Sequence, residues 1–302
     1  MTILVLAGKP SALPSADWVK IDFRMPQIKS WTVSDAFWAK VEPLIPVPQR
    51  SADRAYLRKP GGGRKPMPPR QIFTAIVYVL RTGCQWKALP REFGSASAVH
   101  LHFQKWQAAG FFLRLWQAGL AEYDAMEAIA WNWQSIDGAM HKAPLATECV
   151  GPNPTDRGKN GRKRSLLVDG IGVPLSLVVS GANTHDVKLL EATLDHVVMA
   201  MPGQAGQYNL CADAGYKGTP AMNAVIERDY KPHIKQRREE AQEKQTNPGF
   251  KARRWVVERT HSWINRFRKL LVSFEKTEAS YVALLSLAAA MICWRQITSI
   301  HG

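Results

Sequence analysis

The sequence predicts an α/β protein in which a mixed β-sheet follows a region built from helices. Apolar residues recur at helical spacing up to about residue 126. After about residue 130 the pattern changes to short apolar or alternating runs bounded by Gly and Pro, as in strands. With 302 residues and 46% hydrophobic content, the chain is long enough to bury one large core or two ordinary ones.

The charge balance favours a polyanionic partner. The chain carries 40 Lys and Arg against 25 Asp and Glu, which gives a net charge of +15 and a pI near 9.8. Binding to a phosphate backbone releases counterions, so a chain this basic is typical of nucleic-acid-binding proteins. A membrane surface would attract the same charge, but the sequence contains no polybasic amphipathic helix and no lipidation signal.

Neither a membrane span nor an export signal is indicated. The longest strongly apolar run, Tyr281–Trp294, has 14 residues, fewer than the roughly 20 that cross a bilayer, so we expect a buried helix and no membrane partner. The N-terminus lacks a basic leading segment. The four cysteines are widely spaced without a CxxC pair, which fits a reducing cytoplasm rather than a zinc site or disulfides.

Three regions are predicted along the chain. Residues 1–30 carry three prolines without periodicity and form an N-terminal extension. Residues 31–126 form a helical DNA-binding domain, whose first helix begins near Ser34 and is followed by a basic, Pro- and Gly-rich loop at 50–70. Residues 127–302 form the domain that contains the sheet.

The helical domain has the layout of a helix-turn-helix. The run "RQIFTAIVYVLRTG" predicts a helix that ends at Gly83, "WKALPREFG" a short helix with a Gly turn, and "SASAVHLHFQKWQAAG" a capped second helix. In a helix-turn-helix the second helix enters the major groove. Short helices joined by Gly are also common in ordinary helical cores, so the pattern alone leaves both interpretations open. The candidate DNA contacts on the second helix are Ser95, Ser97, His100, His102, Gln104 and Lys105.

The elements of the last domain follow the order βββαβαβα. "WNWQSIDGA" is the first strand, and "RSLLVDGIGVPLSLVVSGA" holds the next two around an Asp169-Gly170 turn. A helix from His185 to about Val198 follows. "QYNLCADAGY" is a fourth strand ending at Asp213, "GTPAMNAVIERDY" a helix and "KPHIK" a fifth strand before the final helix. This order is that of a ribonuclease H-like fold, in which a mixed sheet brings the first and fourth strands side by side.

The final helix, in Arg253–Leu271, has two predicted faces. The face that we expect to be buried consists of Val257, Thr260, Ile264, Phe267 and Leu271. The stripe that we expect to face outward consists of Arg254, Glu258, His261, Asn265 and Arg268. Its single acid, Glu258, is either an ion-pair partner of Arg254, worth roughly 0.2–0.5 kcal/mol, or a metal ligand among cations that hold phosphates.

Three acids fall where this fold would bring them together: Asp137 on the first strand, Asp213 at the end of the fourth and Glu258 near the start of the final helix. Carboxylates around two Mg²⁺ ions can activate a water or hydroxyl and stabilise the leaving oxygen of a phosphodiester. Each acid also has a purely structural interpretation. Asp137 and Asp169 precede Gly and suit turns, and Asp213 could cap a helix. Asp186 fits a helix N-terminus.

Four segments resemble the DDE transposases of bacterial insertion sequences, in the group called insertion-sequence family five: "SIDGAMHKAP", "DGIGVPLSLVVSGANTHD", "CADAGYKG" and "VVERTHSWINRFRKL". The resemblance covers roughly residues 34–295. It implies a transposase in which Asp137, Asp213 and Glu258 bind two Mg²⁺ ions, with Mn²⁺ able to substitute, and catalyse strand cleavage and strand transfer.

Around Glu258 the pattern of this family is Tyr, two residues, Arg, three residues, Glu, six residues, Lys. Arg254 matches the Arg, whereas Lys251 stands at the Tyr place and Asn265 at the Lys place. A phosphate-binding role at those two positions is not expected. We expect one of the neighbouring cations, Arg266, Arg268 or Lys269, to supply the charge instead.

The resemblance implies DNA as the partner, both the terminal inverted repeats of the element and the target DNA. Synapsis of two ends implies a homodimer or a higher assembly on DNA, and a bacterial transposase implies a cytoplasmic, nucleoid-associated protein. The basic stretch "DRGKNGRKR", Asp156–Arg164, suits a DNA backbone, although a solvated loop would have the same composition. The further candidate contacts are Arg64, Lys65, Lys159, Arg162, Lys163, Arg164, Arg254, Arg266, Arg268 and Lys269.

Two other functions are compatible with the sequence: a DNA-binding regulator that has lost catalysis, and a structure-selective nuclease that cuts without joining. The presence of all three acids argues against the regulator. A tyrosine recombinase would need a Tyr surrounded by Arg and His, which Tyr216 is not. The aromatic-rich run Phe103–Trp116 predicts core residues rather than an interface.

Overall fold

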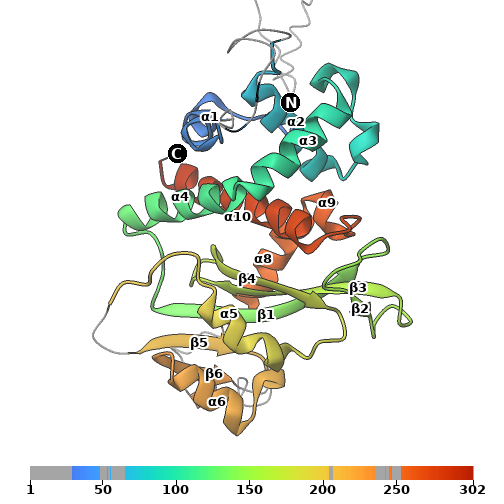
Figure 1. The fold of residues 1–302 in the computed structure, drawn as a ribbon. Coiled ribbons are helices and arrows are strands. Elements are labelled where there is room, and N and C mark those ends of the chain that lie inside the picture. The colour runs from blue at the N-terminus through green and yellow to red at the C-terminus, as the bar shows by residue number, and fades with distance from the viewer. Residues whose placement is uncertain are drawn as a thin grey trace, which may run out of the picture.

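A computed structural model describes residues 29–47, 53, 55, 65–203, 207–234, 242, 245–246 and 253–301. Most of the extension 1–30, most of the basic loop 50–70 with Arg64, and Lys251 lie outside the described residues. In Figure 1 the helical region lies above a β-sheet, and two long helices lie between them.

The first helices begin and end where the sequence indicated. α1 (Asp35–Val41) is capped by Ser34, whose Oγ accepts a backbone N–H of the first turn at 3.2 Å. α2 (Pro69–Thr82) begins with Pro, at a position where the missing N–H would have no helical partner. It ends at Gly83, whose φ of 74° lies in the left-handed region and whose N–H bonds to the Val79 carbonyl.

The expected short helix at "WKALPREFG" is instead a pair of 3-10 turns. η2 (Trp86–Ala88) and η3 (Arg91–Phe93) are separated by Pro90, which cannot donate the N–H that would continue a helix. α3 (Ala96–Ala108) follows, but the Ser95 side chain makes no capping hydrogen bond. α2 and α3 pack against each other, and the helix-turn-helix stays a prediction.

Six strands form one sheet among the described residues: β1 (Trp133–Lys142), β2 (Gly151–Pro152), β3 (Asn160–Val168), β4 (Pro174–Gly181), β5 (Tyr208–Ala212) and β6 (Tyr230–Ile234). β1 pairs antiparallel with β3 and parallel with β5, and β6 is parallel to β5. β4 and the two-residue β2 pair with β3. The first and fourth predicted strands, β1 and β5, are therefore neighbours in a mixed sheet. This confirms the ribonuclease H-like order.

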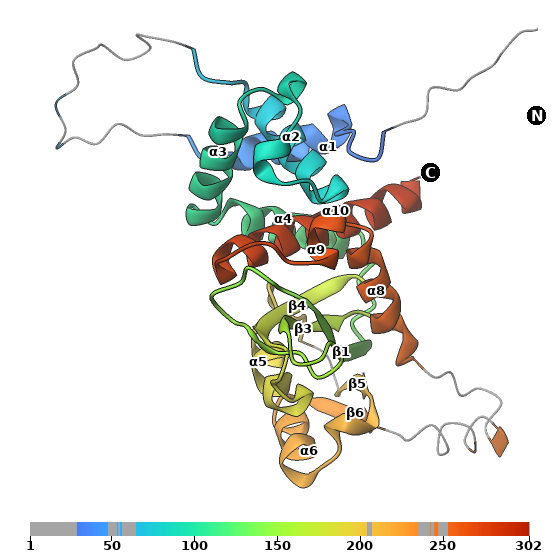
Figure 2. The ribbon, with the colours of Figure 1, turned by 90° about the vertical axis from the view of Figure 1, so that its right-hand side faces the viewer.

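Helices cover both faces of this sheet. η4 (Asp186–Leu189) and α5 (Leu190–Asp195) replace the longer helix predicted from His185, and α5 packs on β3 and β4. α6 (Thr219–Ile226) packs on β6. α8 (Trp255–Asn265) packs on β1 and β3, and Figure 2 shows α5 and α8 on either side of the strands.

The predicted final helix is broken in two. α8 ends at Asn265, and α9 (Arg268–Leu271) begins after Phe267, whose backbone is extended. Because the break turns the last residues away, Leu271 is 50% exposed, whereas the four earlier members of its predicted face are buried as expected. His261, which was expected to face outward, is buried.

α10 (Glu278–His301) lies along α4 (Phe111–Ala125), between the helical region and the sheet (Figure 1). Its length and composition would allow it to cross a membrane, yet most of its apolar window is buried inside the protein. The prediction of a buried helix is confirmed. The aromatic side chains of Phe103–Trp116 are also core residues, as predicted.

The turn between β3 and β4 depends on Asp169, as the Asp169-Gly170 pair predicted. Its Oδ1 accepts the N–H groups of residues 171–173 at 2.7–2.9 Å, and its Oδ2 accepts the Ala130 N–H at 3.1 Å. We expect Asp169→Ala to lower the free energy of unfolding by about 3 kcal/mol, because four donors lose a charged acceptor. Urea denaturation measures the change. Asp169→Asn keeps one acceptor oxygen and should lose less; an Ala variant as stable as wild type would contradict this account.

Candidate active site

Parallel pairing of β1 with β5 brings two acids to the edge at which this pairing ends, in the middle of β1 and directly after β5. Ser135 of β1 stands opposite Cys211 of β5. Asp137 and Asp213 each follow two residues later, and because side chains alternate along extended chain, both carboxylates are directed to the same face. Asp213 also caps the 3-10 turn η5 (Ala214–Tyr216), in which a backbone N–H donates to its Oδ1 at 2.7 Å. Asp213 is therefore a cap residue, as its sequence context allowed, and this does not prevent it from acting at the site as well.

α8 is anchored at this edge. Ser135 Oγ donates a hydrogen bond to the Arg253 carbonyl at 3.1 Å, just before α8 begins. Further along α8, His261 Nε2 lies 3.8 Å from Asp137 Oδ2. Glu258 precedes His261 by three residues, a spacing that places two side chains on one helix face. The structure thus brings the acid of α8 to the edge that carries Asp137.

Burial, and to a lesser degree the neighbouring carboxylates, changes the acidity of Asp137. Its side chain is 29% exposed, and burial, together with the charges of Asp213, Asp186 and Glu258, raises its pKa to about 7. A hydrogen bond from the Gly138 backbone acts in the opposite direction. The ordinary pKa of an Asp carboxyl is about 3.9, so Asp137 takes up a proton far more readily than a solvated carboxylate does.

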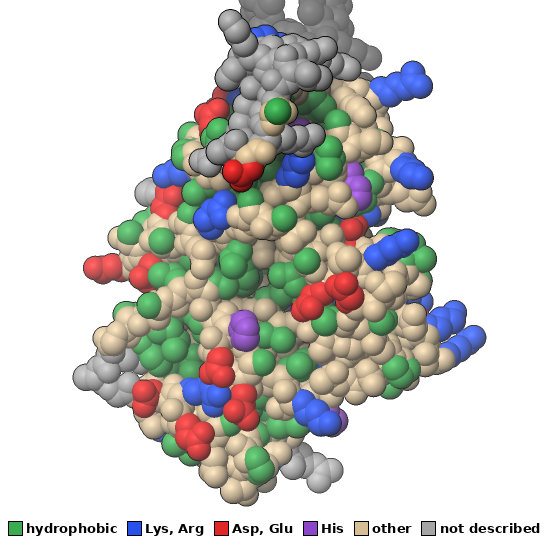
Figure 3. Space-filling model, in the orientation of Figure 1, with side chains coloured by type: hydrophobic (Ala, Val, Ile, Leu, Met, Phe, Trp, Pro, Cys, Tyr) green, Lys and Arg blue, Asp and Glu red, His purple; other side chains and the backbone are tan. Residues whose placement is uncertain are grey.

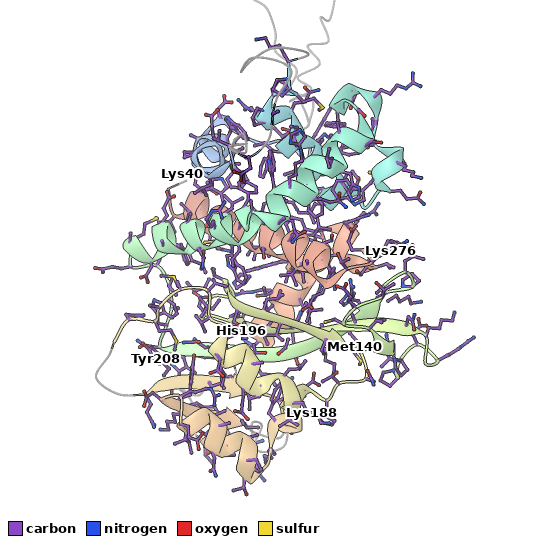
Figure 4. All side chains as sticks on the ribbon, viewed as in Figure 1. Lys40, Met140, Lys188, His196, Tyr208 and Lys276 are labelled. Atoms are coloured by element: carbon purple, nitrogen blue, oxygen red, sulfur yellow. The ribbon has the colours of Figure 1, made fainter. Side chains whose placement is uncertain are left out.

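Asp186 lies close to this site, on the other face of β1 from the Asp137 side chain, although its sequence context indicated only a helix N-terminus. It does begin η4, but it also lies against β1, because a Cβ added at Gly138 would collide with Asp186 Oδ1. Lys163 Nζ pairs with the same oxygen at 2.9 Å. Figure 4 shows this face of the sheet, with Met140 labelled on β1 and Lys188 on η4. The only trace of the contact in the sequence is the Gly after Asp137.

Tyr216 lies next to these carboxylates and is buried. Burial, and then the charges of Asp186, Asp137 and Asp213, raises the pKa of its hydroxyl. A phenolate nucleophile is therefore disfavoured at this position.

His261 is neutral beside Asp137. Burial, and then the positive charge of Arg164, lowers its pKa to about 3. Arg164 Nε donates to His261 Nδ1 at 3.3 Å, so the ring proton must sit on Nε2, which lies 3.4 Å from the Asp137 carbonyl oxygen. Arg164 also donates to Asn265 Oδ1 at 2.6 Å. This chain of contacts links β3 to α8 directly behind the carboxylates.

The three carboxylates suit a divalent metal ion, provided that Glu258 gives up its ion pair with Arg254. Asp137, Asp213 and Glu258 offer hard carboxylate oxygens, which Mg²⁺ and Mn²⁺ prefer, and a cation would offset the repulsion that raises the pKa of Asp137. Among the described residues, no three His, Cys, Asp or Glu side chains are grouped closely enough to hold an ion as they stand. Glu258 Oε1 is paired with Arg254 Nη1 at 2.8 Å, the ion pair that the sequence allowed. An ion bound by Glu258 would compete with Arg254 for this carboxylate.

Four predicted DNA contacts are wrong, because their side chains are buried. β3 begins at Asn160, so most of the basic stretch is a strand whose alternating side chains enter the core on both faces. Arg162 donates to three backbone carbonyls and to the Ser273 hydroxyl. Lys269 Nζ pairs with Glu275 at 3.3 Å. The exposed fractions of Arg162, Lys163, Arg164 and Lys269 are 0%, 5%, 1% and 3%.

The remaining predicted contacts that the structure describes are accessible to different degrees. Arg254 is half-buried, and so is His100, whose ring lies 4.8 Å from the Trp86 ring. His102 is half-buried as well, and the exposed residues are Lys65, Ser95, Ser97, Gln104, Lys105, Lys159, Arg266 and Arg268. Arg64 lies outside the described residues. Contact of these side chains with DNA stays a prediction.

Two family profiles match the chain. Residues 33–116 match the family described as "Putative transposase of IS4/5 family", and residues 134–293 match the family described as "Transposase DDE domain". The "Putative transposase for insertion sequence element IS402" of Burkholderia cepacia is 36% identical over 152 residues, 49% of this chain and 70% of that protein. The "Insertion element IS402 uncharacterized 16.2 kDa protein" of the same organism is 33% identical over 124 residues, 40% of this chain and 80% of that protein.

One of the similar solved structures is the "Mos1 transposase paired-end complex with left transposon end". It has a TM-score of 0.27 and 10% sequence identity, and the match covers 79% of this chain and 81% of that chain.

The raised pKa of Asp137 predicts a pH dependence of stability in the metal-free protein. Between about pH 4 and pH 7 the folded state holds a proton on Asp137 that the unfolded state has lost, so the free energy of unfolding falls as pH rises through this window. Asp137→Asn removes this contribution. We therefore expect the stability of Asp137→Asn relative to wild type to increase from pH 5 to about pH 7.5, measured by urea denaturation in EDTA.

The wild-type curve alone does not isolate this effect. His141 and His261 have pKa values lowered to about 3 by burial, so their contribution to stability is lost as pH falls below about 6.5. Both variants share these histidines, and the difference between the two curves removes them. Parallel curves would show that Asp137 titrates normally.

Proposed function

Because the chain belongs to the DDE transposases of IS4/5-type insertion sequences, it is an enzyme that cleaves and joins DNA strands, and we propose that Asp137, Asp213 and Glu258 are its catalytic acids. One observation carries the proposal. The parallel pairing of β1 with β5 sets Asp137 and Asp213 side by side at one sheet edge, where hydrogen bonding from Ser135 anchors the start of α8.

We infer that the divalent metal implied by the family is Mg²⁺, bound as two ions, and that Mn²⁺ can substitute. Asp137, Asp213 and Glu258 would hold these ions. When bound, such ions lower the pKa of a water or hydroxyl that attacks the phosphodiester and stabilise the oxygen that leaves.

The neighbouring residues neutralise or position these acids. Arg254 pairs with Glu258 in the metal-free protein and would contact a DNA phosphate when DNA is bound. His261 is neutral and fixes the Asp137 backbone through its Nε2 proton. Lys163 balances Asp186 on the opposite face of the sheet, so the fourth carboxylate adds little net charge next to Asp137.

We propose that the DNA is gripped by the helical region as well as by the sheet domain. α3 would act as the recognition helix of a helix-turn-helix, since its Ser97, Gln104 and Lys105 are exposed. Lys65 and Lys159 would contact the backbone on either side of it. Figure 3 shows Lys and Arg side chains projecting along the right-hand side of the molecule, from the helical region down to the sheet. Terminal repeats and target DNA would both be ligands of this basic side.

The protein is cytoplasmic and acts on DNA, as a bacterial insertion-sequence transposase does, and we propose that it is associated with the nucleoid. We also propose a homodimer or a higher assembly on DNA, because transposition requires two ends to be held together. The predicted limits of the helical domain, 31–126, and of the catalytic domain, 127–302, are part of this proposal. Mass measurement of the DNA-bound complex tests it: a single protomer throughout would overturn the assembly.

We expect Asp213→Asn and Glu258→Gln to reduce metal-dependent cleavage of DNA bearing the element's ends by about a hundredfold or more, the scale on which one group that stabilises a transition-state charge acts. Cleavage is measured on gels with Mg²⁺ or Mn²⁺. Glu227→Gln, an exposed acid at the end of α6, is the matched control and should cut like wild type. If Glu258→Gln cuts like the control while binding DNA normally, Glu258 is only the partner of Arg254.

A joining assay with pre-cut ends separates the transposase from the two alternatives. A transposase inserts such ends into a target plasmid, a structure-selective nuclease leaves them unjoined, and an inactive regulator binds them without either reaction. We expect joining by wild type and its loss in Asp137→Asn, because cleavage and transfer use the same acids.

A further inference from the structure

A pocket rich in arginine lies where α2, α8 and α10 meet. Figure 2 shows α8 rising from the sheet to α10, with α2 above them. The pocket is lined by Arg81, Trp263, Arg266, Phe267, Met291, Ile292, Arg295 and Gln296. None of the three regions predicted from the sequence contains all of these residues, so the pocket is a product of the packed structure.

Three arginines line this pocket, and no carboxylate that the structure describes forms an ion pair with them. The Arg81 guanidinium lies over the Phe267 ring, 4.0 Å from its centroid, and Arg81 Nε is buried without a hydrogen-bond partner. Burial, and then the charge of Arg295, lowers the pKa of Arg81. Leaving a buried donor unpaired beside a like charge costs free energy, and an anion bound here would offset that cost.

Part of the positive charge of these arginines is neutralised by the negative ends of two helix dipoles. Arg81 lies in the last turn of α2, and Arg266 caps α8. Each helix C-terminus carries about half a negative charge, so two ends cancel about one of the three positive charges. About two positive charges remain. Arginine pairs with phosphate through two parallel N–H groups, so a phosphate group matches the excess in charge and is a ligand that arginine favours.

The pocket lies at a useful distance from the carboxylates. Arg266 follows Glu258 by eight residues along α8, and at 1.5 Å per residue this is about 12 Å along the helix axis. A DNA strand rises about 3.4 Å per nucleotide, so about three or four nucleotides cover the same distance.

We propose that the pocket of Arg81, Arg266 and Arg295 binds a backbone phosphate of DNA, about three or four nucleotides from the phosphodiester held at the carboxylates. The proposal rests on the proposed function, because the carboxylates define where the DNA is cut. Because the pocket joins α2 of the helical region to the end of α8, one bound phosphate would be held by both parts of the protein. This would fix the position of the DNA strand relative to the carboxylates.

The test measures DNA binding without metal, so it does not depend on catalysis. The probe is a fluorescein-labelled duplex of about 30 base pairs of arbitrary sequence in EDTA, titrated between about 50 and 200 mM salt. Each lost phosphate contact reduces the slope of log K against log salt by about 0.9. We expect this reduction in Arg81→Gln and in Arg295→Gln, with affinity roughly tenfold weaker at the lower salt.

Lys231→Gln is the matched control, since Lys231 is exposed on β6, at the opposite end of the molecule from α2 (Figures 1 and 2). It removes the same charge and should keep the wild-type slope. Because Arg295 is exposed, its variant should fold even if Arg81→Gln does not, and thermal denaturation checks both. Wild-type slopes in a folded Arg295→Gln would overturn the proposal.

Inorganic phosphate separates a DNA site from a site for small anions. If millimolar phosphate raises the Tm of wild type but not that of Arg81→Gln, while the salt slopes are unchanged, the pocket binds a free anion and the DNA assignment is wrong. A failure of the proposed function gives a different result: normal cleavage by Asp213→Asn and Glu258→Gln, with the salt slopes of the arginine variants still reduced.

Discussion

The parallel hydrogen bonding between β1 and β5 is the constraint on which the rest of the site depends. It joins only three residue pairs, from Trp133 opposite Asn209 to Ser135 opposite Cys211. A slip of one residue would send every side chain of one strand to the other face, and Asp137 would no longer share a face with Asp213. Buried Gln134 opposes such a slip, because its Oε1 accepts the Tyr230 hydroxyl at 2.8 Å and so ties β1 to β6 across β5.

Buried arginines also hold the helices on the sheet. Arg162 and Arg164 point from β3 toward α8 and α10, where every hydrogen bond they make is to a carbonyl, a hydroxyl, an amide or a His ring. Burial of such groups costs free energy that these hydrogen bonds offset in part, since Arg164 Nη1 is left without a partner. Their role is to hold α8 and the segment before α10 on the sheet. The net charge of +15 therefore overstates the charge available to DNA, and the exposed cations that remain carry more of that task.

The sequence predicted the strand order and the three acids because both leave local signals: alternating or apolar runs, turn residues such as Asp169, and acids beside them. It could not predict the burial of Lys163 or Arg164, because a strand covered on both faces shows no alternation and its basic residues look like a solvated loop. Asp186 was missed for another reason. Its contact with Gly138 joins separate elements, and the glycine alone does not identify which residue lies against it.

The position of the helical region relative to the acids also follows from buried charge. Lys269 of α9 pairs with Glu275, and Trp86 Nε1 of η2 donates to the same carboxylate at 3.1 Å. A buried pair of this kind contributes little net stability, but losing one partner leaves the other charge uncompensated. The contact therefore favours a single arrangement of η2 on α9, and α3 packs on η2. A DNA duplex held by α3 would in this way lie at a set distance from Glu258, which a cut at a defined position requires.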